Sequence, residues 1–206
     1  MNNTSEEKKH CFLALGDSYT IGEAVPENEC WPMQLVEMFN NAGKPFSKPQ
    51  IIATTGWTTD ELINAIRVEN PQGTFDLVSL LIGVNNQYRG YSKEVYATEF
   101  LDLLKQAIAF SGNIAHHVVV VSIPDWGATP FAKDRNREEI ALEIDQFNAI
   151  NREISQESGV HYVDITPGSR LSLSDFSLVT SDELHPSGKE YLKWAELIFQ
   201  KINYVY

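Results

Sequence analysis

Cysteine is scarce in this sequence, which has only Cys11 and Cys30 among its 206 residues. Two cysteines make no disulfide framework, and their spacing is not that of a metal site. We therefore expect both thiols to be free, with a disulfide between them as the less favoured alternative, and we predict no metal.

Positive charge is scarce as well. Sixteen Lys and Arg residues are outnumbered by 28 Asp and Glu residues, which gives a formal net charge of −12. A protein of that charge repels nucleic acids and anionic membrane surfaces, so we expect no nucleic acid as a partner.

Long apolar runs are absent too. No stretch of about 18 apolar residues occurs, so no stable insertion into a membrane is predicted. Met1 to His10 is polar and charged and lacks the apolar centre of a secretory signal. This segment predicts a cytoplasmic protein, although a secreted protein whose signal peptide had been removed would show the same residues.

The remaining composition is typical of a globular protein. Hydrophobic residues make up 43% of the chain, and there is no internal repeat or low-complexity tract. A chain of this length buries a full core without disulfides or metals. We predict one domain over residues 1–206, monomeric by default.

Strand-like and helix-like segments alternate along the chain. Short apolar or β-branched segments predict five strands, at Phe12–Leu15, Gln50–Thr54, Phe75–Ile82, His117–Ile123 and Val160–Ile165. Amphipathic spacing predicts helices at Trp31–Asn41, from Thr58 or Thr59 to Val68, at Ser92–Phe110, at Arg137–Ser158, and before Ile202. The segment Thr166 to Asp182 lacks such spacing and is predicted to be a surface loop. Alternation of this kind predicts an α/β fold with a five-stranded parallel sheet and helices on both faces.

Unusual residues follow the predicted strands at their carboxyl ends. Ser18 follows the first strand, Gly56 the second and Asn85 the third, and Asp182 to His185 precede the last helix. Because open α/β sheets bind ligands at the carboxyl edge, we expect these residues to meet there.

The residue types at this edge suit nucleophilic catalysis. A serine hydroxyl needs a nearby imidazole to take its proton, and the imidazole needs a carboxylate to fix its tautomer. Ser18, His185 and Asp182 supply these three groups, while Gly56, Asn85 and the Ser18 N–H are candidate donors to an oxyanion. The alternative interpretations are helix capping for Ser18 and Asp182 and a turn role for Asn85.

Four sequence blocks resemble those of the SGNH (GDSL-type) hydrolases. They are Gly16-Asp17-Ser18, Gly56, Gly83-Val84-Asn85 and Asp182-Glu183-Leu184-His185-Pro186, in the order of the family. Two departures are Tyr19-Thr20, where the family usually has Leu-Ser, and Asn85-Asn86, where it often has Asn-Asp. Neither departure removes a reactive group.

The resemblance implies a flavodoxin-like, three-layer α/β/α sandwich and an esterase or lipase-type acyl hydrolase without metal or cofactor. It implies Ser18 as nucleophile, Asp182 and His185 as its partners, and Gly56 and Asn85 as oxyanion donors. The sequence has no Gly-x-Ser-x-Gly motif, which argues against the other common serine-hydrolase fold.

The predicted substrate is a small-molecule, lipid or acylated-sugar ester. Tyr19, Trp57 and Trp126 follow strand ends and are candidate pocket residues, with buried packing as the alternative for the two tryptophans. A carbohydrate deacetylase or an acyltransferase would use the same residues. A non-catalytic binding module of flavodoxin-like fold is the remote alternative, since it would not need the Asp182–His185 pair.

Overall fold

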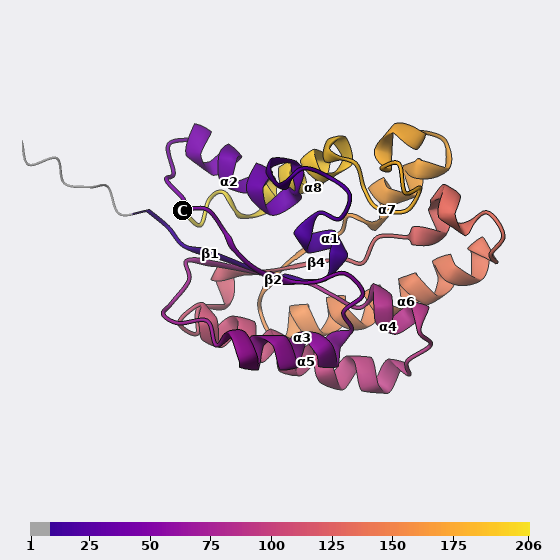
Figure 1. The fold of residues 1–206 in the computed structure, drawn as a ribbon. Helices are drawn as coiled ribbons and strands as arrows, with labels where there is room; N and C mark the ends of the chain where they lie inside the picture. Colours follow the sequence, from indigo (N-terminus) through magenta and orange to yellow (C-terminus); the bar gives the residue numbers. More distant parts are fainter. Residues whose placement is uncertain (1–8) are drawn as a thin grey trace, which may run out of the picture.

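The computed structural model describes residues 9–206 and contains one parallel sheet with strand order β2-β1-β3-β4-β5 (Figure 1). The strands are β1 (Phe12–Gly16), β2 (Gln50–Ala53), β3 (Leu77–Leu81), β4 (Val118–Val121) and β5 (His161–Val163). Every predicted strand is confirmed, although most are shorter than predicted. Most of the segment Met1 to His10 lies outside the described residues.

Helices cover both faces of the sheet (Figure 1). One layer holds α2 (Trp31–Asn41) and α8 (Gly188–Ile202), and the other holds α3 (Thr59–Glu69), α5 (Lys93–Phe110) and α6 (Arg137–Glu157). Three short helices follow strands directly: α1 (Ser18–Ile21), α4 (Val84–Tyr88) and α7 (Thr166–Ser169). The three-layer α/β/α architecture predicted from the sequence is confirmed.

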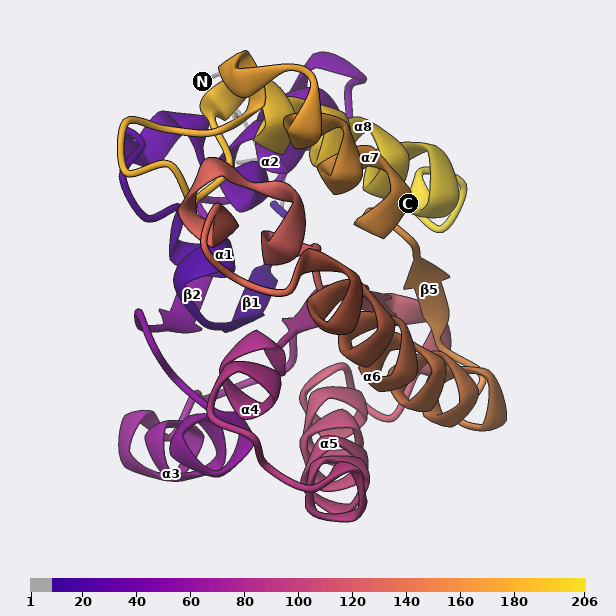
Figure 2. The same cartoon turned by 90° about the vertical axis from the view of Figure 1, so that its right-hand side faces the viewer.

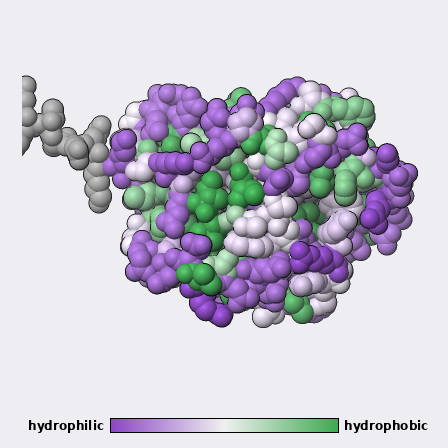
Figure 3. Space-filling model, in the orientation of Figure 1, coloured by the Kyte–Doolittle hydropathy of each residue, from purple (hydrophilic) through white to green (hydrophobic). Residues whose placement is uncertain are grey.

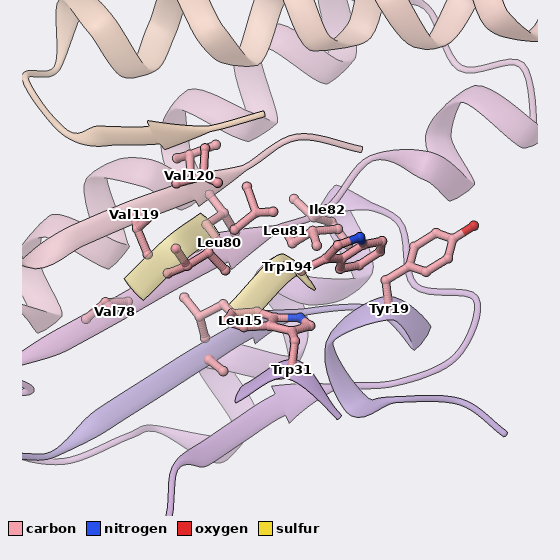
Figure 4. Packing of buried hydrophobic residues seen from close by; sticks show 14 of the residues in the cluster. Leu15, Tyr19, Trp31, Val78, Leu80, Leu81, Ile82, Val119, Val120 and Trp194 are labelled. Carbon is pink, nitrogen blue, oxygen red and sulfur yellow. The ribbon is translucent and has the colours of Figure 1, made fainter. Parts of the chain in front are cut away.

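The central strands form the core because both of their faces are covered. All residues of β1, β3 and β4 are buried, and Leu15 of β1 lies opposite Leu80 of β3 in the ladder. Figure 4 shows these side chains packed with Trp31 of α2 and Trp194 of α8. Tyr19 lies at the edge of this cluster, with its ring 6.2 Å from that of Trp194. The apolar core therefore extends as far as the residue beside Ser18.

The prediction of a surface loop over Thr166 to Asp182 is wrong in part. The segment contains α7 and two 3-10 turns, Arg170–Leu173 and Phe176–Leu178. The hydroxyl of Ser169 donates to the carbonyl of Thr166, and that of Ser172 donates to the carbonyl of Ser169, each at 2.8 Å. Such local hydrogen bonds close turns without any hydrophobic periodicity, so the sequence pattern did not reveal them.

The surface is largely hydrophilic over the helices. In Figure 3, hydrophobic residues gather near the middle of the visible face, close to where the edge strand β2 runs in Figure 1. Cys11 is exposed, Cys30 is buried, and both are free thiols. None of the helices within residues 9–206 is long and apolar enough to cross a membrane.

Candidate active site

The carboxyl edge of the sheet collects segments that are distant in sequence. Figure 2 looks onto this edge, with α1, α4 and the loop before α6 turned toward the viewer. Ser18, Gly56, Asn85 and His185 all line one cavity of about 210 Å³ at this edge. The structure therefore brings together the residues that the sequence placed at separate strand ends.

Ser18 is held at the first position of α1. Asp17 caps this helix, because its Oδ1 accepts a hydrogen bond from the Tyr19 N–H at 3.0 Å. The Ser18 side chain is only 4% exposed, yet it lines the cavity. Its hydroxyl makes no hydrogen bond to any residue from 9 to 206, which leaves it available for a substrate. Contacts between nucleophile and base often close only when substrate binds.

His185 is paired with Asp182 in a short turn. The imidazole Nδ1 lies 2.7 Å from Asp182 Oδ2. Asp182 Oδ1 accepts the backbone N–H groups of Leu184 and His185, each at 2.9 Å, and the Thr180 hydroxyl at 2.7 Å. The carboxylate therefore fixes both the ring and the backbone that carries it.

The environment of Asp182 keeps its carboxylate ionised. Partial burial would raise its pKa, but the hydrogen bonds from the His185 side chain, the His185 and Leu184 N–H groups and the Thr180 hydroxyl outweigh burial and lower the pKa to about 2. An ionised partner on Nδ1 is what an imidazole needs to take a proton on Nε2.

Glu183, between the two members of this pair, has the left-handed backbone φ of 64°. An L-residue in that conformation costs roughly 1–2 kcal/mol. Two hydrogen bonds hold it there: its N–H donates to the Thr180 carbonyl, and its carbonyl accepts the Phe131 N–H, both at 3.0 Å. The turn that joins Asp182 to His185 is thereby braced against the loop before α6.

Tyr19 connects Ser18 with His185. Its ring lies 5.6 Å from the imidazole of His185, and it follows Ser18 directly in the chain. Tyr19 is 3% exposed and lines the cavity, as predicted for a pocket residue. Contact with the ring limits how far His185 can turn away from Ser18.

Three N–H donors were predicted to stabilise an oxyanion, and each has a hydrogen to spare. The Ser18 N–H lies in the first turn of α1, where helix geometry provides no partner, and the Gly56 N–H donates to no described residue. Asn85 uses one amide hydrogen on the Trp57 carbonyl at 3.0 Å, so the second remains free. The guanidinium of Arg89 donates to the Gly56 carbonyl at 2.6 Å and fixes this peptide.

The walls of the cavity are apolar. They are formed by six side chains: Tyr19, Val84, Tyr88, Trp126, Phe131 and Leu184. Trp126 therefore lies where it was predicted. Trp57 does not line this cavity but a separate surface groove beside α3.

Several wall residues had not been identified from the sequence. Tyr88 and Trp126 pack edge to face with ring centroids 5.2 Å apart, and Trp126 packs on Phe131 at 6.1 Å. Tyr88 ends the five-residue helix α4, which gives no periodic signal. A signal that could have found it is its place five residues after Gly83, just beyond the third strand.

Asp17 is buried completely beside Ser18 in the chain. Burial raises its pKa to about 7, against the lowering effect of the Tyr19 N–H bond. Its Oδ2 has no hydrogen-bond partner among residues 9–206. The carboxyl group caps α1 through its other oxygen, Oδ1.

The family model of GDSL-like lipases and acylhydrolases matches residues 14–191. The chain belongs to the GDSL-like lipase/acylhydrolase family. The matched region holds Ser18, Gly56, Asn85, Asp182 and His185, and this GDSL protein is a hydrolase.

Solved structures share the fold of this GDSL protein at low sequence identity. TesA has a TM-score of 0.75 at 13% identity, with 95% of this chain and 99% of that chain covered. Axe2, an acetylxylan esterase from Geobacillus stearothermophilus, has a TM-score of 0.70 at 15% identity, with 94% of each chain covered. The lipase/acylhydrolase from Enterococcus faecalis has a TM-score of 0.68 at 18% identity, with 95% of this chain and 96% of that chain covered. None of the curated proteins is similar enough in sequence to count as a relative.

Proposed function

We propose that this protein hydrolyses carboxylic esters of small molecules through an acyl-enzyme on Ser18. The observation that carries this proposal is the 2.7 Å contact between Asp182 and His185, in a turn that lines the same cavity as Ser18. Helix capping alone would explain Ser18, but it would not require an ionised carboxylate on an imidazole beside it.

The first step forms the acyl-enzyme. His185 Nε2 takes the proton of the Ser18 hydroxyl while the oxygen attacks the ester carbonyl, and the resulting imidazolium is stabilised by Asp182. The tetrahedral intermediate then collapses as the C–O bond to the alcohol breaks, and the imidazolium returns its proton to that oxygen. In the second step water attacks the acyl group with the same base, which releases the acid and restores Ser18.

The negative charge that develops on the carbonyl oxygen needs donors. The N–H groups of Ser18 and Gly56 and the free amide hydrogen of Asn85 support this role, since none is used by a described neighbour. Loss of one such donor typically lowers kcat by about 10² to 10³.

The apolar cavity suits a small acyl group. Its volume of about 210 Å³ lies below the roughly 300–1,000 Å³ of typical ligand pockets. Aromatic walls from Tyr88, Trp126 and Phe131 favour a short hydrocarbon chain over a polar one. Hydrolysis, deacetylation of a carbohydrate and acyl transfer would share these residues and differ in the alcohol or the acceptor.

The proposal is tested with purified protein and p-nitrophenyl esters of two to eight acyl carbons. We expect cleavage of the shorter esters, and loss of nearly all activity in the Ser18→Ala and His185→Ala variants. Ser177→Ala, which changes an exposed serine outside the cavity, is the matched control and keeps activity. Full activity in the Ser18 or His185 variant would refute the mechanism.

A fluorophosphonate probe separates an enzyme from a binding module. We expect it to label the wild-type protein on Ser18 and to leave the Ser18→Ala variant unlabelled. Absence of labelling, together with absence of ester cleavage, would favour the non-catalytic alternative.

A further inference from the structure

A second hollow adjoins the catalytic cavity on the far side of Tyr88 and Trp126. It has a volume of about 390 Å³, and these two aromatic residues line both spaces. Its other wall comes from the loop before α6 and the first two turns of that helix. It is mostly polar, with Arg135, Asn136, Glu139 and Glu143 beside the apolar Ile140. Figure 2 shows α4, which carries Tyr88, beside α6.

The groove is held open by hydrogen bonds beneath it. The Trp126 indole N–H donates to Gln87 Oε1 at 2.7 Å, and Gln87 Nε2 donates to Glu143 Oε2 at 2.6 Å. Gln87 is buried, so this chain of bonds joins α4, the Trp126 turn and α6 below the surface. Arg137 also donates to the Gly127 carbonyl at 2.6 Å and ties the start of α6 to the same turn. The two walls of the groove are therefore fixed relative to each other.

The composition of the groove differs sharply from that of the cavity. The cavity walls are hydrocarbon and aromatic, whereas the groove offers a guanidinium, an amide and two carboxylates opposite the half-exposed ring of Tyr88. Donors and acceptors in such number suit a ligand with several hydroxyl groups, and the aromatic face suits the apolar side of a ring. Within residues 9–206, Asn136 Nδ2 donates to Glu139 Oε2 at 3.1 Å and Glu143 Oε2 accepts from Gln87, which leaves the Arg135 guanidinium and the second oxygen of each carboxylate for a ligand.

We propose that this groove binds the alcohol portion of the ester, and that this alcohol is a neutral, polyhydroxylated ring such as a sugar. The inference rests on the proposed ester hydrolysis, because it places the leaving group just outside the cavity that takes the acyl chain. Arg135 and Glu139 are the specificity-determining residues, since both are exposed in the groove and lie outside the catalytic turn.

The charge of the protein argues for a neutral alcohol. Two carboxylates and one guanidinium leave the groove acidic, and the chain as a whole carries a formal charge of −12. A phosphorylated or otherwise anionic leaving group would be repelled by this surface.

The first test compares two acetate esters of similar ring size. Methyl 6-O-acetylglucopyranoside offers hydroxyl groups to the groove, and cyclohexyl acetate offers none. We expect the sugar ester to have the higher kcat/KM by at least tenfold. The Arg135→Ala and Glu139→Ala variants should each raise KM for the sugar ester about five- to tenfold, as loss of one or two hydrogen bonds predicts, without changing kcat/KM for cyclohexyl acetate.

Neighbouring residues supply the controls. Lys133→Ala and Glu138→Ala remove a cation and an anion from the same segment, and neither side chain lines the groove. Both variants should behave as wild type on both esters. Equal sensitivity of the control and groove variants, or no preference for the sugar ester, would overturn the inference while leaving ester hydrolysis intact.

Binding of the free sugar tests the groove independently of catalysis. Methyl glucopyranoside should shift the NMR signal of the Trp126 indole N–H in the wild-type protein and in Ser18→Ala, and the shift should weaken in Arg135→Ala. Binding without cleavage of any ester would support the groove and overturn the proposed function. No shift at millimolar sugar would overturn the groove even if esters were cleaved.

Discussion

The imidazole Nδ1 of His185 lies 2.7 Å from the Asp182 carboxylate only three residues away, so the two side chains share one turn. The mutual geometry of the pair is therefore set mainly within the turn, which the hydrogen bond from the Phe131 N–H to the Glu183 carbonyl braces from outside. The approach of this turn to Ser18 depends on tertiary packing.

The role of Asp182 is tested by Asp182→Asn. The amide still accepts the N–H groups of Leu184 and His185 through its oxygen, so the turn should persist. It cannot stabilise the imidazolium, and kcat should fall on the order of 10³- to 10⁴-fold with little change in KM. Steady-state kinetics on a p-nitrophenyl ester measures this. Asp175→Asn, which changes a nearby exposed carboxylate, should remain fully active, and a similar loss in that control would mean that the effect is not specific.

Two adjacent asparagines are predicted to have different roles. Asn85→Ala removes a candidate oxyanion donor, so kcat should fall about 10²- to 10³-fold while the urea midpoint moves little. Asn86 is buried and bonds both the N–H and the hydroxyl of Thr59. Asn86→Ala should therefore lower the free energy of unfolding by about 1–3 kcal/mol. Kinetics and urea unfolding of both variants decide the assignment, which a large loss of stability in Asn85→Ala would contradict.

Asp17 predicts an unusual dependence of stability on pH. Its pKa is about 7 in the folded protein and 3.8 when exposed, so the folded state binds the proton more tightly. The tighter binding stabilises the folded protein by up to about 4 kcal/mol. This contribution to the free energy of unfolding is fully present below about pH 4 and is lost as the pH rises through 7. Asp17→Asn cannot ionise, so its stability relative to wild type should increase between pH 4 and pH 8. Urea unfolding across this range measures the difference, and parallel pH profiles would contradict it.

Gly83 separates β3 from Asn85 and has no room for a side chain. Its φ is 128°, and a Cβ there would lie 2.6 Å from Tyr96 Cε2 and 2.8 Å from Ile123 Cδ1. Gly83→Ala should lower the free energy of unfolding by about 1–3 kcal/mol through overpacking, in addition to backbone strain. Gly159→Ala, which also has a positive φ but an open surrounding, should show the strain alone. Equal urea midpoints for the two variants would show that packing at Gly83 is unimportant.

Trp126 is predicted to limit the length of the acyl chain. Because it separates the apolar cavity from the polar groove, Trp126→Ala should shift the optimum among p-nitrophenyl esters toward longer chains. Trp57→Ala provides the control, since that side chain lies outside the cavity. The chain-length profile should change in the first variant only, and an unchanged profile would remove Trp126 from the acyl site.

The sequence predicted the sheet and the residues that gather at its carboxyl edge because both have local signals. Buried strands such as Phe75–Ile82 are recognised as mostly apolar segments. Because strands that alternate with helices run parallel, their carboxyl ends lie at one edge of the sheet. Asp182 and His185 could be paired from their spacing. These predictions require no knowledge of how side chains pack.

The walls of the site could not be predicted in this way. Trp57 and Trp126 both follow strand ends, yet only Trp126 turns into the cavity, because Gln87 holds its indole N–H. Arg135 and Glu139 resemble any charged residues at the start of a helix. Their importance depends on the position of Tyr88 across the groove, which is a tertiary relationship.

The order of the site residues along the chain also has a kinetic consequence. Ser18 follows the first strand, whereas His185 precedes α8, whose Gly188 carbonyl accepts a hydrogen bond from Gln34 of α2 at 3.0 Å. A polypeptide that has folded only as far as β5 has Ser18 in place but not His185. On the proposed mechanism, esterase activity during refolding would therefore recover no earlier than the turn that carries His185 and the helix that follows it are docked.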